Sequence, residues 1–362
     1  MATTADVAAL QPTRVSKGAS SRVEWVDAVR GLAILLVVFG HAAGGLIDAA
    51  GPGAMPALRY VFLAIYTFHM PVFFFLSGMF AEQRLQKGPS SALSKLLVTI
   101  VYPYFLWSII QYSLIFGLGS LVNHPVNQYW RTILALPWQP VSQFWFLHAL
   151  FLIHLLGLCA WRIGGARAVL AIAVLVKLAV MVVPMPAAIS LAASNAPYYA
   201  LGFFIGASRV SNWLVRASTE VRAVIMLSAI AALVILCINA DALQLYLKVE
   251  TASSAGIARI AWIPAMLPAT LLSGASIMLL AERSTRVQGL AARAIEYLGT
   301  LSMPIFLLHI IFIAGARILL GKLFGLSGVA VLPLLVIVGI AGPLIVRRAT
   351  DRLGLTRLFA LA

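Results

Sequence analysis

Arg30 and His41 are the two residues of this chain whose types and spacing most directly suggest chemistry. They lie in one apolar stretch with ten residues between them. On a helix this spacing is about three turns, so the two side chains share a face and lie roughly 16 Å apart along the axis. That predicts a cation at the membrane edge and an imidazole near mid-bilayer. Because ionisable groups in lipid are costly, the pair is a candidate functional site.

Asp27 precedes Arg30 by three positions and therefore shares its helix face. Its carboxylate either holds the arginine in place or marks the start of the helix. A neutral imidazole is the natural general base near pH 7. We therefore predict His41, Arg30 and Asp27 as the catalytic group.

The composition indicates the bundle that must position these residues. Of the 362 residues, 62% are hydrophobic and only 10% are charged, which is far too little polar surface for a soluble protein of this size. In a soluble chain the net charge of +15 would suggest nucleic acid, but here the cations stand between apolar runs, as in a membrane protein. The two cysteines fall in apolar runs and are predicted to be small buried residues, with no metal site.

The apolar runs predict an all-α polytopic membrane protein of about ten transmembrane helices. We expect these helices at about 31–47, 60–80, 96–118, 143–161, 168–185, 196–209, 222–239, 260–281, 298–320 and 328–346.

The distribution of charge predicts the orientation of these helices. With the N-terminus in the cytoplasm, 19 basic residues fall on inner segments, 6 fall on outer ones, and Lys177 lies within the fifth helix. This excess predicts that both termini are cytoplasmic. The chain then divides into a cytoplasmic tail (1–24), a transmembrane domain (25–347) and a second short cytoplasmic tail (348–362).

The acidic residues help to choose among functions for such a bundle. All eleven are predicted near helix ends or in loops, whereas proton-coupled carriers commonly place carboxylates at mid-membrane depth. The residues expected inside the bundle are histidines, namely His41, His69, His148, His154 and His309.

A lone histidine in a helix bundle is ordinarily a satisfied packing group, and His154 and His309 are interpreted in that way. His69 is followed closely by Pro71, which frees backbone carbonyls within a span. His148 follows an aromatic run that contains Trp145. We predict that four residues line a substrate cavity: His69, Ser77, Trp145 and His148.

The inner loop after the second helix is basic. Arg84, Lys87 and Lys95 can serve orientation alone, or they can bind a phosphorylated cytoplasmic ligand together with Arg30.

Five segments, taken in this order, resemble the membrane acyltransferase-3 family of acyl-CoA-dependent acyltransferases. They are 25–41 (WVDAVRGLAILLVVFGH, similar to the family's basic-residue-x10-His motif), 68–78 (FHMPVFFFLSG), 102–107 (YPYFLW), 144–147 (FWFL) and 298–309 (LGTLSMPIFLLH). Within the family, the first two segments look most similar to the fucose 4-O-acetylase and nodulation-factor acetylase branch.

The resemblance implies a donor, usually acetyl-CoA, that enters from the cytoplasm, and an acceptor hydroxyl on a sugar. It gives His41 the role of the family's essential histidine and Arg30 that of its basic partner. We therefore expect an inner-membrane O-acetyltransferase acting on cell-surface or secreted glycans, with donor phosphates near Arg30, Arg84, Lys87 and Lys95 and with no metal.

Two questions stay open at this point. His41 can act as a general base on the acceptor hydroxyl or as a transient acyl carrier. The main alternative function is a transporter or flippase for a lipid-linked sugar, and a second is a non-catalytic membrane assembly factor. Against a transporter are the missing mid-membrane carboxylates and the lack of a visible inverted repeat.

Overall fold

The computed structural model describes residues 24–361 apart from 52, 242, 244–260 and 288, and within this part every regular element is helical. The predicted N-terminal tail thus lies almost entirely outside the described residues. The helices are α1 (Glu24–Ala50), α2 (Pro56–Met79), α3 (Ala81–Leu85), α4 (Pro89–Leu96), α5 (Tyr102–Leu118), α6 (Tyr129–Ala135), α7 (Trp145–Val182), α8 (Ala187–Ile205), α9 (Ala207–Arg216), α10 (Thr219–Ile238), α12 (Ile263–Val287), α13 (Leu290–Thr300), α14 (Ser302–Phe324) and α15 (Leu332–Arg352).

Eight segments of the described chain are long and apolar enough to cross a membrane, so the prediction of a polytopic helical membrane protein is confirmed at this level. They are Glu24–Ala50, Pro56–Met79, Pro89–Leu121, Ser142–Val182, Thr219–Ile238, Ile263–Val287, Ser302–Lys322 and Val329–Arg352.

The difference between eight segments and the predicted ten lies at α7 and α8. The 38 residues of α7 would measure about 57 Å as one straight helix, roughly twice a 30 Å hydrocarbon core. Gly164 and Gly165 have non-helical backbone angles and break the helix in two. The helix α8 begins nine residues before the predicted 196–209, because Pro197 sits inside the helix without ending it.

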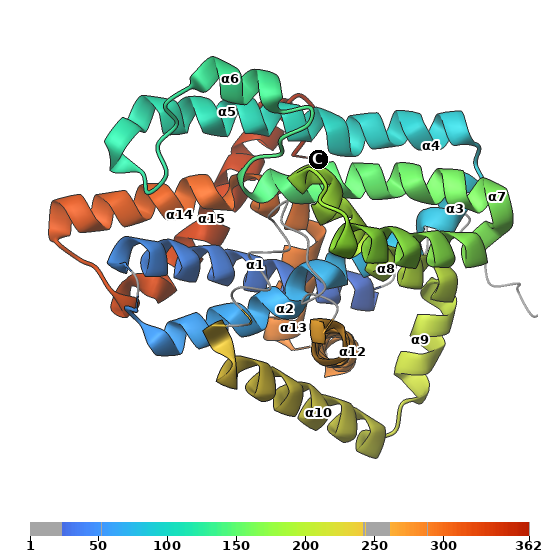
Figure 1. Cartoon of the computed structure of the whole chain (residues 1–362). Helices are drawn as coiled ribbons and strands as arrows, with labels where there is room; N and C mark the ends of the chain where they lie inside the picture. The colour runs from blue at the N-terminus through green and yellow to red at the C-terminus, as the bar shows by residue number, and fades with distance from the viewer. Residues whose placement is uncertain (1–23, 52, 242, 244–260, 288, 362) are drawn as a thin grey trace, which may run out of the picture.

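The helix α1 runs through the middle of the molecule (Figure 1) and packs against α2, α12, α13, α14 and α15. Small residues permit this central position. An added Cβ at Gly299 of α13 would lie 1.7 Å from the backbone oxygen of Asp27, so the two backbones touch there. Close approach through small residues is how membrane helices gain packing energy without a hydrophobic drive between them.

The outer surface of the bundle is apolar in the way that lipid requires. On α10 only Ala229 and Leu236 are buried, while Val224, Leu227 and Ile230 are exposed. The prediction that both cysteines are buried is wrong. Cys159 is exposed on α7 and Cys237 is half-buried. An apolar residue in a membrane helix can face lipid as readily as the core.

The segment after α15 folds back onto the bundle. Trp107 of α5 donates its indole N–H to the Phe359 carbonyl at 2.8 Å, and Leu361 is fully buried. Residues 353–361 therefore pack against α5.

Candidate functional site

His41 lines a cavity of about 160 Å³ inside the helix bundle. The imidazole is half-buried because one side of it faces this space. The cavity is lined by Val37, His41, Tyr66, Thr67, His69, Met70, Pro71, Gln143, Trp145, Leu191, Asn195, Tyr198, Met266, Thr270 and Phe306. Six helices thus meet at this cavity, since its lining residues come from α1, α2, α7, α8, α12 and α14, with Gln143 just before α7.

Aromatic and imidazole rings stack around His41 in a continuous chain. The ring centroid of His41 is 5.0 Å from that of His309 and 6.4 Å from that of Tyr66. Tyr66 in turn lies 4.8 Å from His69, which is three residues further on the same face of α2. Three histidines from α1, α2 and α14 are thereby brought into one cluster.

Two histidines of this cluster are held by their own helices. His69 Nδ1 lies 2.8 Å from the Ile65 carbonyl, and His309 Nδ1 lies 2.9 Å from the Ile305 carbonyl. Since a carbonyl only accepts, each Nδ1 carries the proton and donates it, which leaves Nε2 as an acceptor. The His309 ring is fully buried, and its Nε2 has no hydrogen-bond partner among the described residues.

Amide and hydroxyl groups complete the polar side of the cavity. Gln143 exchanges two hydrogen bonds with Gln111 of α5, at 3.1 and 2.8 Å. The Thr270 hydroxyl donates to the Thr67 carbonyl at 3.1 Å and so ties α12 to α2. The amide groups of Gln143 and Asn195 have hydrogen-bonding capacity left for a polar ligand in the cavity.

The predicted basic residues lie at the opposite end of α1 from the cavity. Arg30 Nη1 is 3.4 Å from the Asp27 carboxylate, and both lie in the first two turns of this helix. Arg84 of α3 is partly buried, and its Nη1 lies 3.3 Å from His154 Nε2. Burial lowers the pKa of Arg84, and the charge of nearby Arg30 lowers it further. Arg30 and Arg84 carry like charges, and guanidinium groups are suited to binding an anion.

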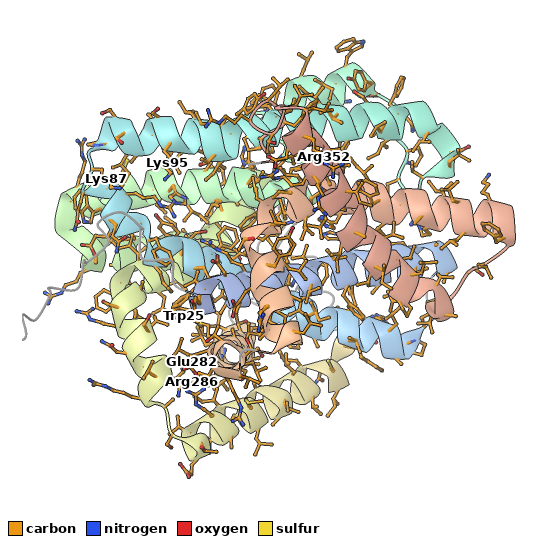
Figure 2. All side chains as sticks on the ribbon, turned by 180° about the vertical axis from the view of Figure 1, so that it is seen from behind. Trp25, Lys87, Lys95, Glu282, Arg286 and Arg352 are labelled. Atoms are coloured by element: carbon orange, nitrogen blue, oxygen red, sulfur yellow. The ribbon has the colours of Figure 1, made fainter. Side chains whose placement is uncertain are left out.

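Lys87 and Lys95 are exposed on the α3–α4 side (Figure 2). Neither lysine lines the His41 cavity.

Ser77 and His148 are not among the residues that line the cavity, whereas His69 and Trp145 are. Ser77 is seven positions after Met70, so it shares that face of α2 but lies two turns, about 10 Å, further along the helix axis. His148 Nε2 lies 3.0 Å from the Pro137 carbonyl, and the ring lies 5.5 Å from Tyr104. A loop carbonyl and a neighbouring helix thus hold His148 at a different place.

Tyr66, Gln143 and Asn195 also line the cavity and are not among the predicted cavity residues. Tyr66 carried one signal, its i, i+3 spacing to His69 on α2. Gln143 and Asn195 carried none, because an amide in an apolar stretch looks the same whether it packs or binds. His309 and His154, interpreted as packing groups, lie beside His41 and Arg84 respectively.

A metal site is a different matter. Within the part of the chain that the structure describes, no group of three or more histidine, cysteine, aspartate or glutamate side chains is arranged to hold a metal ion.

Comparison with known proteins identifies the family of this chain. Residues 23–348 match the family model described as the acyltransferase domain of type 3. The chain belongs to the acyltransferase-3 family. The predicted resemblance is therefore confirmed over most of the sequence, and it includes the segments that supply His41, His69 and His309.

A curated relative narrows the branch of the acyltransferase-3 family. The nodulation protein NolL of Mesorhizobium japonicum is 29% identical over 196 residues, which are 51% of this chain and 48% of that protein. The chain thus matches about half the length of this relative, in agreement with the predicted likeness to the nodulation-factor branch. No solved structure matches the chain.

The contact between Arg84 and His154 predicts a measurable stability effect. Because His154 Nδ1 lies 2.8 Å from the Leu150 carbonyl and donates to it, Nε2 accepts from the arginine. A hydrogen bond to a charged group contributes about 1.5–3 kcal/mol. We expect His154→Phe to destabilise the folded protein by this amount in thermal unfolding in detergent, and His154→Gln, which keeps an acceptor, to lose less.

His124→Phe is the matched control, since this histidine side chain is 84% exposed. Equal unfolding temperatures for His154→Phe and His124→Phe would mean that the Arg84–His154 bond contributes nothing.

Proposed function

We propose that this protein is an integral membrane O-acetyltransferase that moves an acetyl group from acetyl-CoA to a sugar hydroxyl of a cell-surface or secreted glycan. Membership of the acyltransferase-3 family supports acyl transfer, and the nodulation relative favours a sugar acceptor. The observation that carries the proposal is the cavity in the helix bundle that His41 and His69 line, with the buried His309 ring 5.0 Å from that of His41.

The donor approaches from the arginine end of α1. Its phosphates bind near Arg30 and Arg84, with Lys87 and Lys95 raising the local positive potential. From Arg30 to His41 the helix rises about 16 Å, so a long flexible arm is needed to bring a thioester to the imidazole. Coenzyme A has its anionic groups at one end and its thioester at the other, as this separation requires.

His41 is the proton acceptor in the favoured route. The imidazole takes the proton of the acceptor hydroxyl, whose oxygen attacks the thioester carbonyl. The C–S bond then breaks, and the imidazolium returns the proton to the departing thiolate. In the second route, a His41 nitrogen attacks the thioester carbonyl, the C–S bond breaks, and the thiolate leaves with the imidazole proton. The acceptor oxygen then attacks the acetyl-imidazole, the C–N bond breaks, and the hydroxyl proton returns to the imidazole.

His309 is a positioning residue for His41 in either route. Its buried Nε2 is an acceptor with no hydrogen-bond partner among the described residues, and its ring lies 5.0 Å from that of His41. An N–H of His41 that donates to this nitrogen leaves the other imidazole nitrogen of His41 as the base. Second partners of this kind fix which nitrogen of a catalytic histidine is basic.

A transporter is the second candidate, and the buried carboxylate of Glu282 is the observation that bears on it. Glu282 lies within α12, which extends six residues beyond the predicted 260–281, and it pairs with Arg222 at 2.9 Å and with Arg286 (Figure 2). Two guanidinium groups pair with this carboxylate, which suits a structural anchor that ties α12 to α10 better than a proton carrier.

In the proposed arrangement the chain crosses the inner membrane ten times, and both of its termini lie in the cytoplasm. Eight segments are long and apolar enough to cross, and two further crossings are needed to reach ten. One comes from counting the two halves of α7, on either side of Gly164–Gly165, as separate crossings, and the other is α8. Arg162 and Arg167 flank the break, and basic residues favour the cytoplasmic side.

Cysteine labelling tests this arrangement. In a background with Cys159 and Cys237 changed to alanine, Arg167→Cys is expected to react with an impermeant maleimide only from the cytoplasmic side. His124→Cys, in the loop between α5 and α6, is the opposite-side control and reacts only from outside. Labelling of both cysteines from the same side would be incompatible with ten crossings.

Acetyl transfer tests the role of His41. Membranes that carry the wild-type chain are given labelled acetyl-CoA and extracted cell-surface glycans. We expect His41→Ala to lower transfer about 10²–10⁴-fold, the range that a general base contributes. We expect His309→Phe to lower transfer less than His41→Ala does, and to lower mainly kcat, because His309 orients the base without touching the acceptor.

His124→Ala should transfer label like the wild type. Unchanged transfer by a folded His41→Ala protein would move the chemistry away from this residue. Label that remains on wild-type protein in the absence of acceptor, and that His41→Ala lacks, would select the acyl-carrier route.

Thermal stabilisation tests the donor site apart from catalysis. A ligand present at a hundred times its Kd stabilises the native state by about 2.7 kcal/mol. We expect coenzyme A to raise the unfolding temperature of the wild type and of Arg348→Ala, an exposed arginine of α15, but not of Arg30→Ala or Arg84→Ala. Stabilisation by sugars alone would favour the transporter.

A further inference from the structure

A second hollow, which we call the apolar groove, lies next to the histidine cavity and has a volume of about 520 Å³. It runs between α2, α8, α9 and α12 and is lined by Pro71, Val72, Phe75, Tyr198, Leu201, Ile205, Arg209, Val210, Trp213, Thr270, Leu271, Gly274, Ala275 and Met278. Arg209 is the one charged residue among these described lining residues. The groove is thus a site for hydrocarbon with one cation beside it.

The groove and the histidine cavity have a common wall. Pro71, Tyr198 and Thr270 line both spaces. Whatever occupies the groove at this end therefore contacts the side chains that enclose the cavity of His41. From Thr270 to Met278 the α12 backbone rises about 12 Å, close to half of a ~30 Å hydrocarbon core.

The other end of the groove has the residues of a membrane interface. The helix α9 is short and amphipathic, with Val210 and Leu214 buried and Arg209 and Trp213 exposed. Such helices lie in the plane of the headgroups, where arginine and tryptophan are the favoured residues. The Trp25 indole donates to Ser211 at 3.0 Å and anchors α9 beside the start of α1.

The chemistry of the groove selects among possible occupants. A pantetheine arm carries two amides, and a buried amide without a partner costs about 1–3 kcal/mol. The hydroxyl of Thr270 already donates to the Thr67 carbonyl, and most of the remaining wall is hydrocarbon. A fatty acyl chain has no such cost, and each buried CH₂ contributes about 0.8 kcal/mol.

Arg209 determines which end of the groove holds the charged group of the occupant. Its Nη1 donates to the Phe204 carbonyl at 3.2 Å, and a guanidinium has five N–H donors, so it can bind a phosphate while it keeps this bond. We propose that the apolar groove is a phospholipid site, with the phosphate at Arg209 beside Trp213 and one acyl chain running along α12 to Tyr198 and Thr270. The chain end then closes the lateral side of the His41 cavity.

Two substitutions test the two halves of this site. Arg209→Ala removes the phosphate contact. Gly274→Leu fills the groove without overlap at its Cβ, whose nearest neighbour, Val72 Cγ2, would lie 3.5 Å away. Native mass spectrometry of detergent-purified protein titrated with phosphatidylglycerol is expected to show one tightly retained lipid on the wild type. Each variant should bind it at least tenfold more weakly.

Matched controls keep this experiment specific. Gly315→Leu also adds a side chain to a helix glycine, and no atom lies within 4 Å of its Cβ position. Arg216→Ala removes another arginine of α9 that does not line the groove. Both controls should retain the lipid like the wild type.

A second measurement covers variants that fold poorly. A phospholipid brominated near the headgroup end of its chain should quench Trp213 fluorescence, read as the difference between the wild type and Trp213→Phe, and the quenching should saturate at one lipid per chain. Equal lipid retention by all variants, or quenching that never saturates, would overturn the phospholipid site. Displacement of the lipid by coenzyme A would overturn it as well, by assigning the groove to the pantetheine arm.

Discussion

The cost of placing polar and ionisable groups inside an apolar helix bundle governs this structure. Each such group must find a partner within the protein, because lipid supplies none. His69, His154 and His309 solve this in the same way, since each Nδ1 bonds to the carbonyl four residues earlier on its own helix. The bond satisfies one nitrogen and fixes the tautomer, so that each ring presents Nε2 to its neighbour. His41 instead faces the cavity and the His309 ring, and it is the histidine best placed to exchange protons with a ligand.

The same cost explains the paired charges at the arginine end of the bundle. Glu282 bonds Arg222 and Arg286, Asp27 bonds Arg30, and Arg84 donates to His154. The last pair differs from the others because the partner is a neutral imidazole. It holds the guanidinium in place without cancelling its charge, and so Arg84 keeps its attraction for an anion. A carboxylate in the position of His154 would anchor the arginine more strongly and weaken that attraction.

The helices and the position of His41 inside the bundle could be predicted from the sequence, and the residues that surround His41 could not. Hydropathy finds long apolar helices because lipid imposes composition along a whole segment. The interval from Arg30 to His41 needs only the geometry of one helix. The neighbourhood of His309, by contrast, depends on how α14 packs against α1, and this contact joins segments that lie far apart in the sequence. Local sequence contains no record of such a crossing, and for that reason His309 and His154 look like ordinary packing residues until the helices are assembled.

Under the proposed function, an aqueous donor meets a polar acceptor in the His41 cavity, and lipid must be kept out of this space. In this bundle the wall formed by Pro71, Tyr198 and Thr270 is the boundary, since these residues face polar groups on one side and the apolar groove on the other. The bond from Thr270 to the Thr67 carbonyl locks that wall by joining α12 to α2. The Thr270 hydroxyl proton is used in this bond and is not available as a donor to a ligand in either space. Neither ligand needs to break the bond in order to bind. The polar and apolar spaces can thus lie within one side chain of each other and still bind chemically opposite ligands.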